Sequence, residues 1–259
     1  MTILSEDWGG PGWDSQARLV GGRWVERRPR RPDVAARLLR ETRLAPWLAP
    51  LLPLPIPVPR VLHVEPLIVR HEAVPGEPLE SFDAGRGRAL GGFLRALHAA
   101  DPARAVRLGA QPAAEVLRER AAGTADLAAR VVPLLPRERR AAAAELLEAV
   151  AAFPACAVVH GDLAPEHVLE RDGAVSGVID FTDAHVGDPA LDLAWPLHGA
   201  PPAFAGAVAA AYGVPAGLRE RALLWWRLGP WHEVVYGLDG DRPDRVRDGL
   251  AAVLARLPR

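Results

Sequence analysis

Hydrophobic and polar positions alternate over short runs in the first seventy residues and then recur at helical spacing through most of the remaining chain. Gly21-Gly22 lies between two of the short runs, and glycine reaches the positive φ that a tight hairpin turn requires. The segment LPLPIPVPRV cannot be helical, because each proline fixes φ and disfavours helix in the residue before it. The expected elements are strands at 18–20 and 23–27, a helix from Asp33 to Leu48, an extended connector at 52–61, and strands at 61–64 and 67–69.

Beyond Gly76 the pattern predicts long helices interrupted by one β-hairpin. Leu90, Phe93, Leu94 and Leu97 form an apolar stripe at helical spacing, which is typical of a core face. Asp172-Gly173, a favoured pair for a two-residue turn, separates two β-like runs. The expected elements are helices at 116–132 and 137–153, a buried strand at 156–159, strands at 168–170 and 175–179, and helices again from 188 onward. The chain is therefore expected to be an α+β protein with a β-rich N-terminal part and a larger helical part.

Composition excludes several classes of protein. With 259 residues and 49% hydrophobic content, the chain can bury a core as one large domain or as two lobes. Its formal net charge of -1 argues against nucleic acid as a partner. Cys156 is the only cysteine, so no internal disulfide forms, which fits a reducing compartment. The acidic start and the absence of a long apolar run predict a soluble, cytoplasmic protein.

Two residue types are missing altogether, because the sequence contains neither lysine nor asparagine and all 31 basic residues are arginine. A site that ordinarily uses either type must use another residue here.

Polar and ionisable residues gather at the ends of apolar strands between positions 160 and 192. His160, Asp162 and His167 follow CAVV, while Asp180 and Asp183 follow SGVI. Because the hairpin between them folds back on itself, His167 should lie near Asp180 and beside Asp162. An imidazole and a carboxylate in that arrangement form a reasonable site for a divalent metal, next to a base that could orient a hydroxyl group.

These segments carry a resemblance to a known family. HGDLAPEH followed by VIDF resembles the catalytic and metal-binding segments of the aminoglycoside phosphotransferase family, which is similar in fold to the protein kinases. The commonest family pattern has Asn where this chain has His167, and macrolide phosphotransferases and aminoglycoside 2''-phosphotransferases share the histidine. The resemblance implies a protein-kinase-like bilobal fold, with a nucleotide-binding lobe at residues 1–73 and a helical lobe at residues 74–259.

The resemblance also implies roles for the residues of the catalytic segments. Asp162 would accept or orient the acceptor hydroxyl, and His167 and Asp180 would hold Mg²⁺ against the triphosphate of ATP or GTP. His160 would buttress the loop, and Asp192 would fix it from behind.

In the N-terminal lobe, the family places a phosphate-binding lysine on a strand and a glutamate on the following helix. Arg27 is the positional match to the lysine and Glu41 to the glutamate; arginine offers a bidentate fork for phosphate oxygens. The turn at Gly9–Gly12, with Ser15 just after it, resembles the family's phosphate-covering loop. The hinge would lie at residues 71–73, where backbone groups of His71 and Ala73 would meet the purine.

The acceptor pocket is expected in the helical lobe, where aromatic rings could stack on a ring of the acceptor and polar groups could bind its hydroxyls. For any single tryptophan, packing between helices is the favoured interpretation. The candidate acceptor-binding residues are Asp183, Trp195, Trp231, His232, Glu233 and Tyr236.

The predicted function is transfer of the terminal phosphate of ATP or GTP to a hydroxyl of an antibiotic, either an aminoglycoside, a macrolide, a nucleoside or a peptide, conferring resistance. The protein would act as a monomer or homodimer. A primary metabolite is an alternative acceptor. Two further hypotheses are a kinase-like binding protein without turnover and a metal-dependent phosphoesterase. The metal centre of the phosphoesterase would draw on His160, Asp162, His167, Asp180, Asp183 and His185.

Overall fold

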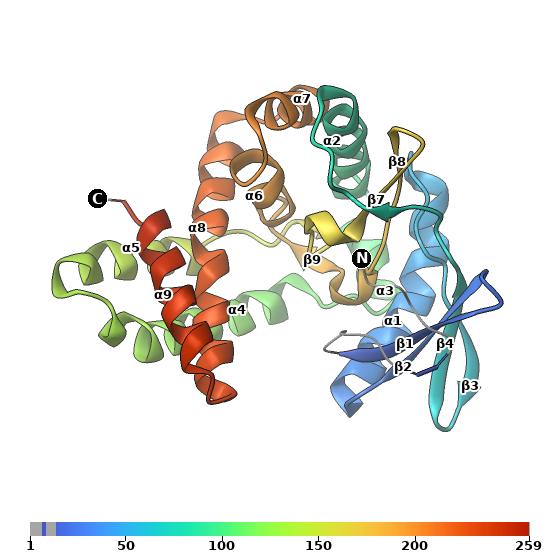
Figure 1. Cartoon of the computed structure of the whole chain (residues 1–259), viewed down its shortest axis with the longest axis horizontal. Coiled ribbons are helices and arrows are strands. Elements are labelled where there is room, and N and C mark those ends of the chain that lie inside the picture. Colours follow the sequence, from blue (N-terminus) through green and yellow to red (C-terminus); the bar gives the residue numbers. More distant parts are fainter. Residues whose placement is uncertain (1–6, 9–13, 259) are drawn as a thin grey trace.

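The computed structural model describes residues 7–8 and 14–258 and has the mixed α+β architecture that the sequence predicts (Figure 1). An antiparallel sheet with strand order β1-β2-β4-β3 forms the N-terminal part, and helix α1 lies beside it. The bounds are β1 Ser15–Val20, β2 Trp24–Pro29, α1 Pro32–Leu48, β3 Arg60–Val64 and β4 Leu67–Glu72. Gly21 and Gly22 turn between β1 and β2 with φ of 57° and 64°, which confirms the predicted hairpin.

Helix α1 begins slightly earlier than expected. Its first residue is Pro32, one position before the expected Asp33, and the residue at its N-cap is Arg31. A proline suits the first turn of a helix, because its missing N–H would be unpaired there in any case. Asp33 instead lies in the first turn, where an acidic side chain favours the positive end of the helix dipole.

The helical part contains two hydrophobic cores. In the first, α7 packs against α2 and α6; in the second, α4, α5 and α9 pack with α8, which carries the buried ring of Trp231. Figure 1 shows the second group at the end of the molecule opposite the N-terminal sheet. The bounds are α2 Ala84–His98, α3 Pro102–Arg107, α4 Ala113–Arg130, α5 Arg140–Ala151, α6 Ala190–His198, α7 Pro202–Tyr212, α8 Ala216–Asp239 and α9 Pro243–Arg256.

Two glycines allow α2 and α7 to approach closely. A Cβ atom on Gly87 would lie 2.6 Å from the carbonyl oxygen of Phe204, and one on Gly91 would lie 2.5 Å from that of Val208. Both distances are below any normal contact, so a larger residue would force the helices apart. The contact matters for the site because α2 also carries His98, which contacts the side chain of Asp192 beneath the loop that follows β6.

Short strands frame the segment between positions 157 and 187. Strand β7 of the hairpin β7–β8 also pairs with β5, while β6 and β9 form a separate antiparallel pair. The bounds are β5 Glu77–Pro78, β6 Ala157–Val159, β7 Val168–Arg171, β8 Ala174–Val178 and β9 His185–Gly187. Because β6 pairs with β9 and β7 with β8, the two connecting loops, which carry the predicted site residues, leave the strands at one place.

Residues 73–76 connect β4 of the first sheet to β5 of the second, and the division of the chain into lobes at residue 73 stays a prediction. Among the helices of the described residues, none is both long and apolar enough to cross a membrane.

Candidate active site

The loop after β6 is held from behind by Asp192, which lies in the first turn of α6 and is fully buried. Its Oδ2 accepts the backbone N–H of His160 at 2.7 Å, and its Oδ1 accepts the N–H of Gly161 at 3.0 Å. His98 of α2 lies 3.0 Å from Oδ2 through its Nε2. Burial would raise the pKa of Asp192, but the hydrogen bonds and the nearby imidazoles outweigh it and hold this pKa below its usual value.

Glycine is required in this loop by the contact it makes. Gly161 has φ of 89°, and a Cβ atom there would lie 2.5 Å from the carbonyl oxygen of Asp183. The loop after β6 and the turn before β9 therefore press directly against one another.

His160 joins the loop to the residue before Asp180. The Asp162 N–H donates to His160 Nδ1 at 3.3 Å, so Nδ1 is an acceptor and the ring hydrogen sits on Nε2. Nε2 in turn donates to the carbonyl oxygen of Ile179 at 2.8 Å. The ring is completely buried, so His160 ties two chain segments together and does not face an open site.

The structure brings Asp162, His167 and Asp180 together, as the hairpin argument predicts. The Ile179 N–H donates to the carbonyl oxygen of His167 at 2.8 Å, which closes the base of the hairpin. His167 Nδ1 donates to the carbonyl oxygen of Asp162 at 2.7 Å, while its Nε2 lies 3.9 Å from Asp180 Oδ2. The hydrogen on Nδ1 leaves Nε2 as the nitrogen that can offer a lone pair.

Asp162 presents its carboxylate to solvent. Its side chain is 63% exposed, and Oδ2 lies 4.0 Å from His167 Nδ1. Desolvation raises the pKa of Asp162, His167 opposes this, and the Asp183 carboxylate adds to it. Because water reaches most of the side chain, it screens much of these effects.

Asp180 adopts a left-handed backbone conformation with φ of 65°, which is uncommon for a residue with a side chain. Burial would raise its pKa, yet the charges of Arg27 and His167 and a hydrogen bond from Thr182 hold the pKa well below its usual range. The carboxylate is therefore ionised at any physiological pH.

Arg27 of β2 lies at the centre of a buried network. Its Nε donates to Ser15 Oγ at 3.2 Å, its Nη1 to Glu41 Oε2 at 3.2 Å, and its Nη2 to Asp180 Oδ1 at 3.2 Å and Thr182 Oγ1 at 2.7 Å. Burial would lower the pKa of Arg27, but Glu41 and Asp180 raise it. Burial raises the pKa of Glu41 above its usual value. The network joins the N-terminal sheet and α1 to the residue proposed as a metal ligand.

Sequence reasoning missed two members of this site, Thr182 and Arg37. Thr182 belongs to the short 3-10 helix Phe181–Asp183 and is 3% exposed. Arg37 of α1 donates to Asp183 Oδ1 at 2.5 Å and to Asp14 Oδ2 at 2.7 Å. Neither residue belongs to a periodic pattern. The only sequence signal for Thr182 is its place two residues after Asp180. Asp183, expected at the acceptor, thus lies near the site but is paired with Arg37.

The predicted hinge is partly engaged in the sheet. The Ala73 N–H donates to the Arg23 carbonyl oxygen at 2.8 Å, so this group continues the β2–β4 ladder. A purine bound here would have to meet other backbone groups of the segment. His71 is buried, and burial lowers its pKa to about 4. Its Nδ1 lies 2.9 Å from the carbonyl oxygen of Glu72. The predicted glycine turn at Gly9–Gly12 lies outside the described residues.

Of the six predicted acceptor-binding residues, Trp231 was assigned wrongly, because its ring is buried between helices, and Trp195 also packs against other rings. Trp231 has 0% exposure in the second core, and its indole N–H finds no hydrogen-bond partner within residues 7–8 and 14–258. Trp195 packs edge-on against Phe82, with ring centroids 6.3 Å apart, and against Phe204.

Glu233 and Tyr236 face α9. Glu233 Oε1 lies 2.5 Å from Arg245 Nη1, and the Arg245 guanidinium lies 5.4 Å from the centroid of the Tyr236 ring. Their neighbour His232 is exposed.

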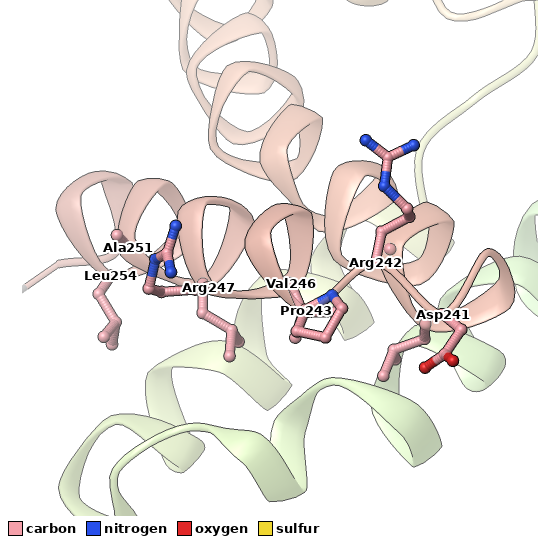
Figure 2. A pocket seen from close by; sticks show the side chains of 10 residues that line it. Asp241, Arg242, Pro243, Val246, Arg247, Ala251 and Leu254 are labelled. Atoms are coloured by element: carbon pink, nitrogen blue, oxygen red, sulfur yellow. The ribbon is translucent and has the colours of Figure 1, made fainter.

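A hollow of about 650 Å³ opens along α9 and the turn that precedes it, and Figure 2 shows its side chains. It shares no residue with the catalytic segments or with the predicted acceptor-binding set. It is lined by Gly237, Leu238, Asp241, Arg242, Pro243, Val246, Arg247, Leu250, Ala251 and Leu254.

The residues present fit a magnesium ion only when it is shared with a nucleotide. Within the described part of the chain, no group of three or more His, Cys, Asp or Glu side chains could hold a metal by itself. His167 Nε2 and Asp180 Oδ2 nevertheless face each other, and Mg²⁺ typically takes one or two protein ligands together with phosphate oxygens and waters.

Comparisons with known proteins concern the family and the fold of the chain. A family model described as "Phosphotransferase enzyme family" matches residues 10–225. The GDP and kanamycin complex of APH(2")-IIia superposes with a TM-score of 0.84 at 24% identity, over 99% of this chain and 94% of that one. Macrolide 2'-phosphotransferase MphH from Brachybacterium faecium superposes with a TM-score of 0.73 at 27% identity, over 97% of this chain and 91% of that one. The protein-kinase-like fold is thereby confirmed.

One curated protein matches over a short stretch. The uncharacterized protein YcbJ of Bacillus subtilis (strain 168) is 49% identical over 37 residues, which are 14% of this chain and 12% of that protein.

Proposed function

The chain belongs to the phosphotransferase enzyme family and is an O-phosphotransferase, and we propose that it transfers the terminal phosphate of ATP or GTP to a hydroxyl of a small antibiotic. The observation that carries the proposal is the convergence of Asp162, His167 and Asp180, which places an exposed carboxylate beside a pair of residues suited to a metal–triphosphate. One superposing structure is a complex with GDP, which supports a nucleotide as the phosphate donor.

The donor would be bound from both sides of the site. His167 and Asp180 would hold Mg²⁺, which when bound neutralises charge on the phosphate oxygens. Arg27 would offer the triphosphate its positive charge and the one N–H of Nη1 that Glu41 does not accept, with Glu41 holding the arginine in place. Ser15, which accepts from Arg27 Nε, would steady the same side chain.

Asp162 would act on the acceptor. Its exposed carboxylate can accept the hydrogen of an incoming hydroxyl and aim the oxygen at the terminal phosphorus. The new oxygen–phosphorus bond forms as the bond to the nucleoside diphosphate breaks, and Asp162 takes the proton. Because such a transition state is loose, holding the groups in line contributes more than a strong base would.

The acceptor class rests on the relatives. One superposing structure contains kanamycin and another is named a macrolide 2'-phosphotransferase, so aminoglycosides and macrolides are the first acceptors to test. Asp183 is paired with Arg37, so a cationic acceptor that used this carboxylate would have to displace the arginine. Modification of such a hydroxyl would confer resistance. Action in the cytoplasm, as a monomer or homodimer, stays a prediction.

The test is to incubate the full chain with ATP or GTP, MgCl₂ and a panel of aminoglycosides, macrolides, nucleosides and peptide antibiotics, and to follow the acceptor by mass spectrometry. We expect a phosphate added to at least one antibiotic and none with the Asp162→Asn variant. Release of phosphate from simple esters without nucleotide would instead favour the phosphoesterase hypothesis. Transfer to an amino alcohol or sugar alone would favour the metabolite kinase.

A further inference from the structure

Thr182 occupies a position at which three charged side chains meet. Its hydroxyl lies 2.7 Å from Arg27 Nη2, 2.8 Å from Asp180 Oδ1 and 3.3 Å from Glu41 Oε2, and the residue is almost completely buried. Arg27 comes from β2 and Glu41 from α1, whereas Thr182 and Asp180 lie in the turn after the β7–β8 hairpin. The threonine therefore lies where the two halves of the molecule touch.

The hydrogen-bonding capacity of a hydroxyl decides what Thr182 can do there. Arg27 can only donate, so Thr182 accepts from Nη2 and has one proton left to give. Asp180 Oδ1 is nearer than Glu41 Oε2 by half an ångström, so the proton is donated to Asp180. Asp180 Oδ1 thus accepts one hydrogen bond directly from Arg27 and a second from Thr182, whose own hydroxyl is held by the arginine.

The presence of arginine at position 27 makes this relay possible. A lysine carries its charge on one nitrogen, whereas the guanidinium spreads three nitrogens in a fixed plane. In this chain, which has no lysine, Nη1 reaches Glu41 while Nη2 reaches both Asp180 and Thr182. The threonine and the arginine form one unit.

The consequence falls on the orientation of Asp180. Its Oδ1 receives hydrogen bonds from Arg27 and Thr182, which leaves Oδ2 as the oxygen that faces His167 Nε2 at 3.9 Å. A carboxylate is planar, so holding Oδ1 sets the direction of Oδ2. Of the two hydrogen bonds to Oδ1, the one from Thr182 is the shorter, at 2.8 Å against 3.2 Å for the one from Arg27.

We propose that Thr182 is a positioning residue. Its hydroxyl accepts a hydrogen bond from Arg27 and donates one to Asp180, and it thereby directs the second carboxylate oxygen of Asp180 toward the metal–triphosphate. The inference rests on the proposed function. It differs from a space-filling role because valine, which has nearly the volume of threonine but no hydroxyl, would fill the same space and would not orient the carboxylate.

The experiment measures how strongly Mg²⁺ tightens nucleotide binding. The full chain, Thr182→Val and Thr182→Ser are titrated by calorimetry with non-hydrolysable analogues of ATP and GTP, first with excess EDTA and then with saturating MgCl₂. The ratio of the two dissociation constants is the coupling between metal and nucleotide. Losing a hydrogen bond to a charged group should reduce this ratio about tenfold in Thr182→Val. Thr182→Ser should stay within about twofold of the wild type.

Two outcomes overturn the proposal: an unchanged ratio in Thr182→Val, or an equal reduction in the valine and serine variants. If Thr182→Val fails to fold, Thr182→Ser and Thr182→Ala form the deciding pair, because both lack the methyl group and differ only in the hydroxyl; equal ratios in that pair refute the role. If the wild type itself shows no tightening by Mg²⁺ and no transfer, the proposed function fails as well. If Mg²⁺ tightens nucleotide binding in the wild type and the wild type transfers phosphate, only the role of Thr182 is refuted.

Discussion

Replacing Asp192 by asparagine should loosen the catalytic loop while changing almost no volume. The carboxylate receives three hydrogen bonds, two on Oδ2 from the His160 N–H and from His98 and one on Oδ1 from the Gly161 N–H. An amide has only one oxygen, and its NH₂ cannot accept. Whichever way the amide is turned, at least one buried donor faces another donor.

The size of the effect follows from those three bonds. A buried donor without an acceptor costs about 1–3 kcal/mol, and each remaining bond weakens by about 1 kcal/mol when its acceptor loses its charge. Relief of the buried charge of Asp192 offsets part of this loss. Because its pKa is below the usual value, however, the folded protein favours the charged form overall. We expect a net loss of about 2–4 kcal/mol in the free energy of opening the loop.

Hydrogen exchange measures this loss where it should occur. The amides of His160 and Gly161 should exchange roughly 30- to 1000-fold faster in Asp192→Asn, by the relation of 1.4 kcal/mol to a factor of ten. The matched control is Asp172→Asn in the exposed Asp-Gly turn of the β7–β8 hairpin, whose side chain is 88% exposed. That variant should leave both amides unchanged, because asparagine suits the turn equally well. Equal protection in Asp192→Asn and the wild type would refute the anchoring role.

Three further outcomes are expected. Gly91→Ala should lower the free energy of unfolding by about 1–3 kcal/mol, because its methyl group would overlap a carbonyl of α7. Gly92→Ala, with open space around it, should raise the free energy of unfolding by up to about 1 kcal/mol. Equal effects of the two variants in urea denaturation would contradict the close approach of α2 and α7. Burial lowers the pKa of His71 to about 4, so the contribution of its neutral form to stability is complete above about pH 6.5 and is lost as the pH falls toward 4. Over that range the free energy of unfolding of the wild type should fall by up to about 3 kcal/mol more than that of His71→Asn. Parallel profiles of unfolding free energy against pH for the two proteins would contradict this. Asp162→Asn should abolish transfer while calorimetry finds nucleotide affinity unchanged, and a variant that turns over normally would end the role assigned to this carboxylate.

Much of the architecture could be predicted locally. The hairpin turns at Gly21-Gly22 and Asp172-Gly173 depend on neighbouring residues alone, and the structure has both. The convergence of His167 and Asp180 was also predictable, because the ends of a hairpin must meet whatever else the chain does. These features need only short-range geometry, which the order of residues determines.

The aromatic residues of α6 and α8 could not be assigned in the same way. Trp195 and Trp231 have the composition of a binding surface, yet both pack helices. Whether a ring faces a core or an acceptor depends on which helix lies against it, and that is a property of the assembled layers.

What the sequence by itself determined is the family, the α+β class and the place of Asp162, His167 and Asp180 in one loop region. What only the tertiary structure decided is how the N-terminal lobe reaches that region: Arg27 meets Thr182 and Arg37 meets Asp183 across about 150 positions of the chain. Nothing in the local sequence marks one threonine or one of 31 arginines for such a contact. The physical reason is that each pair joins elements that are far apart in the sequence, so the two side chains meet only when the sheet, α1 and the β7–β8 hairpin have docked.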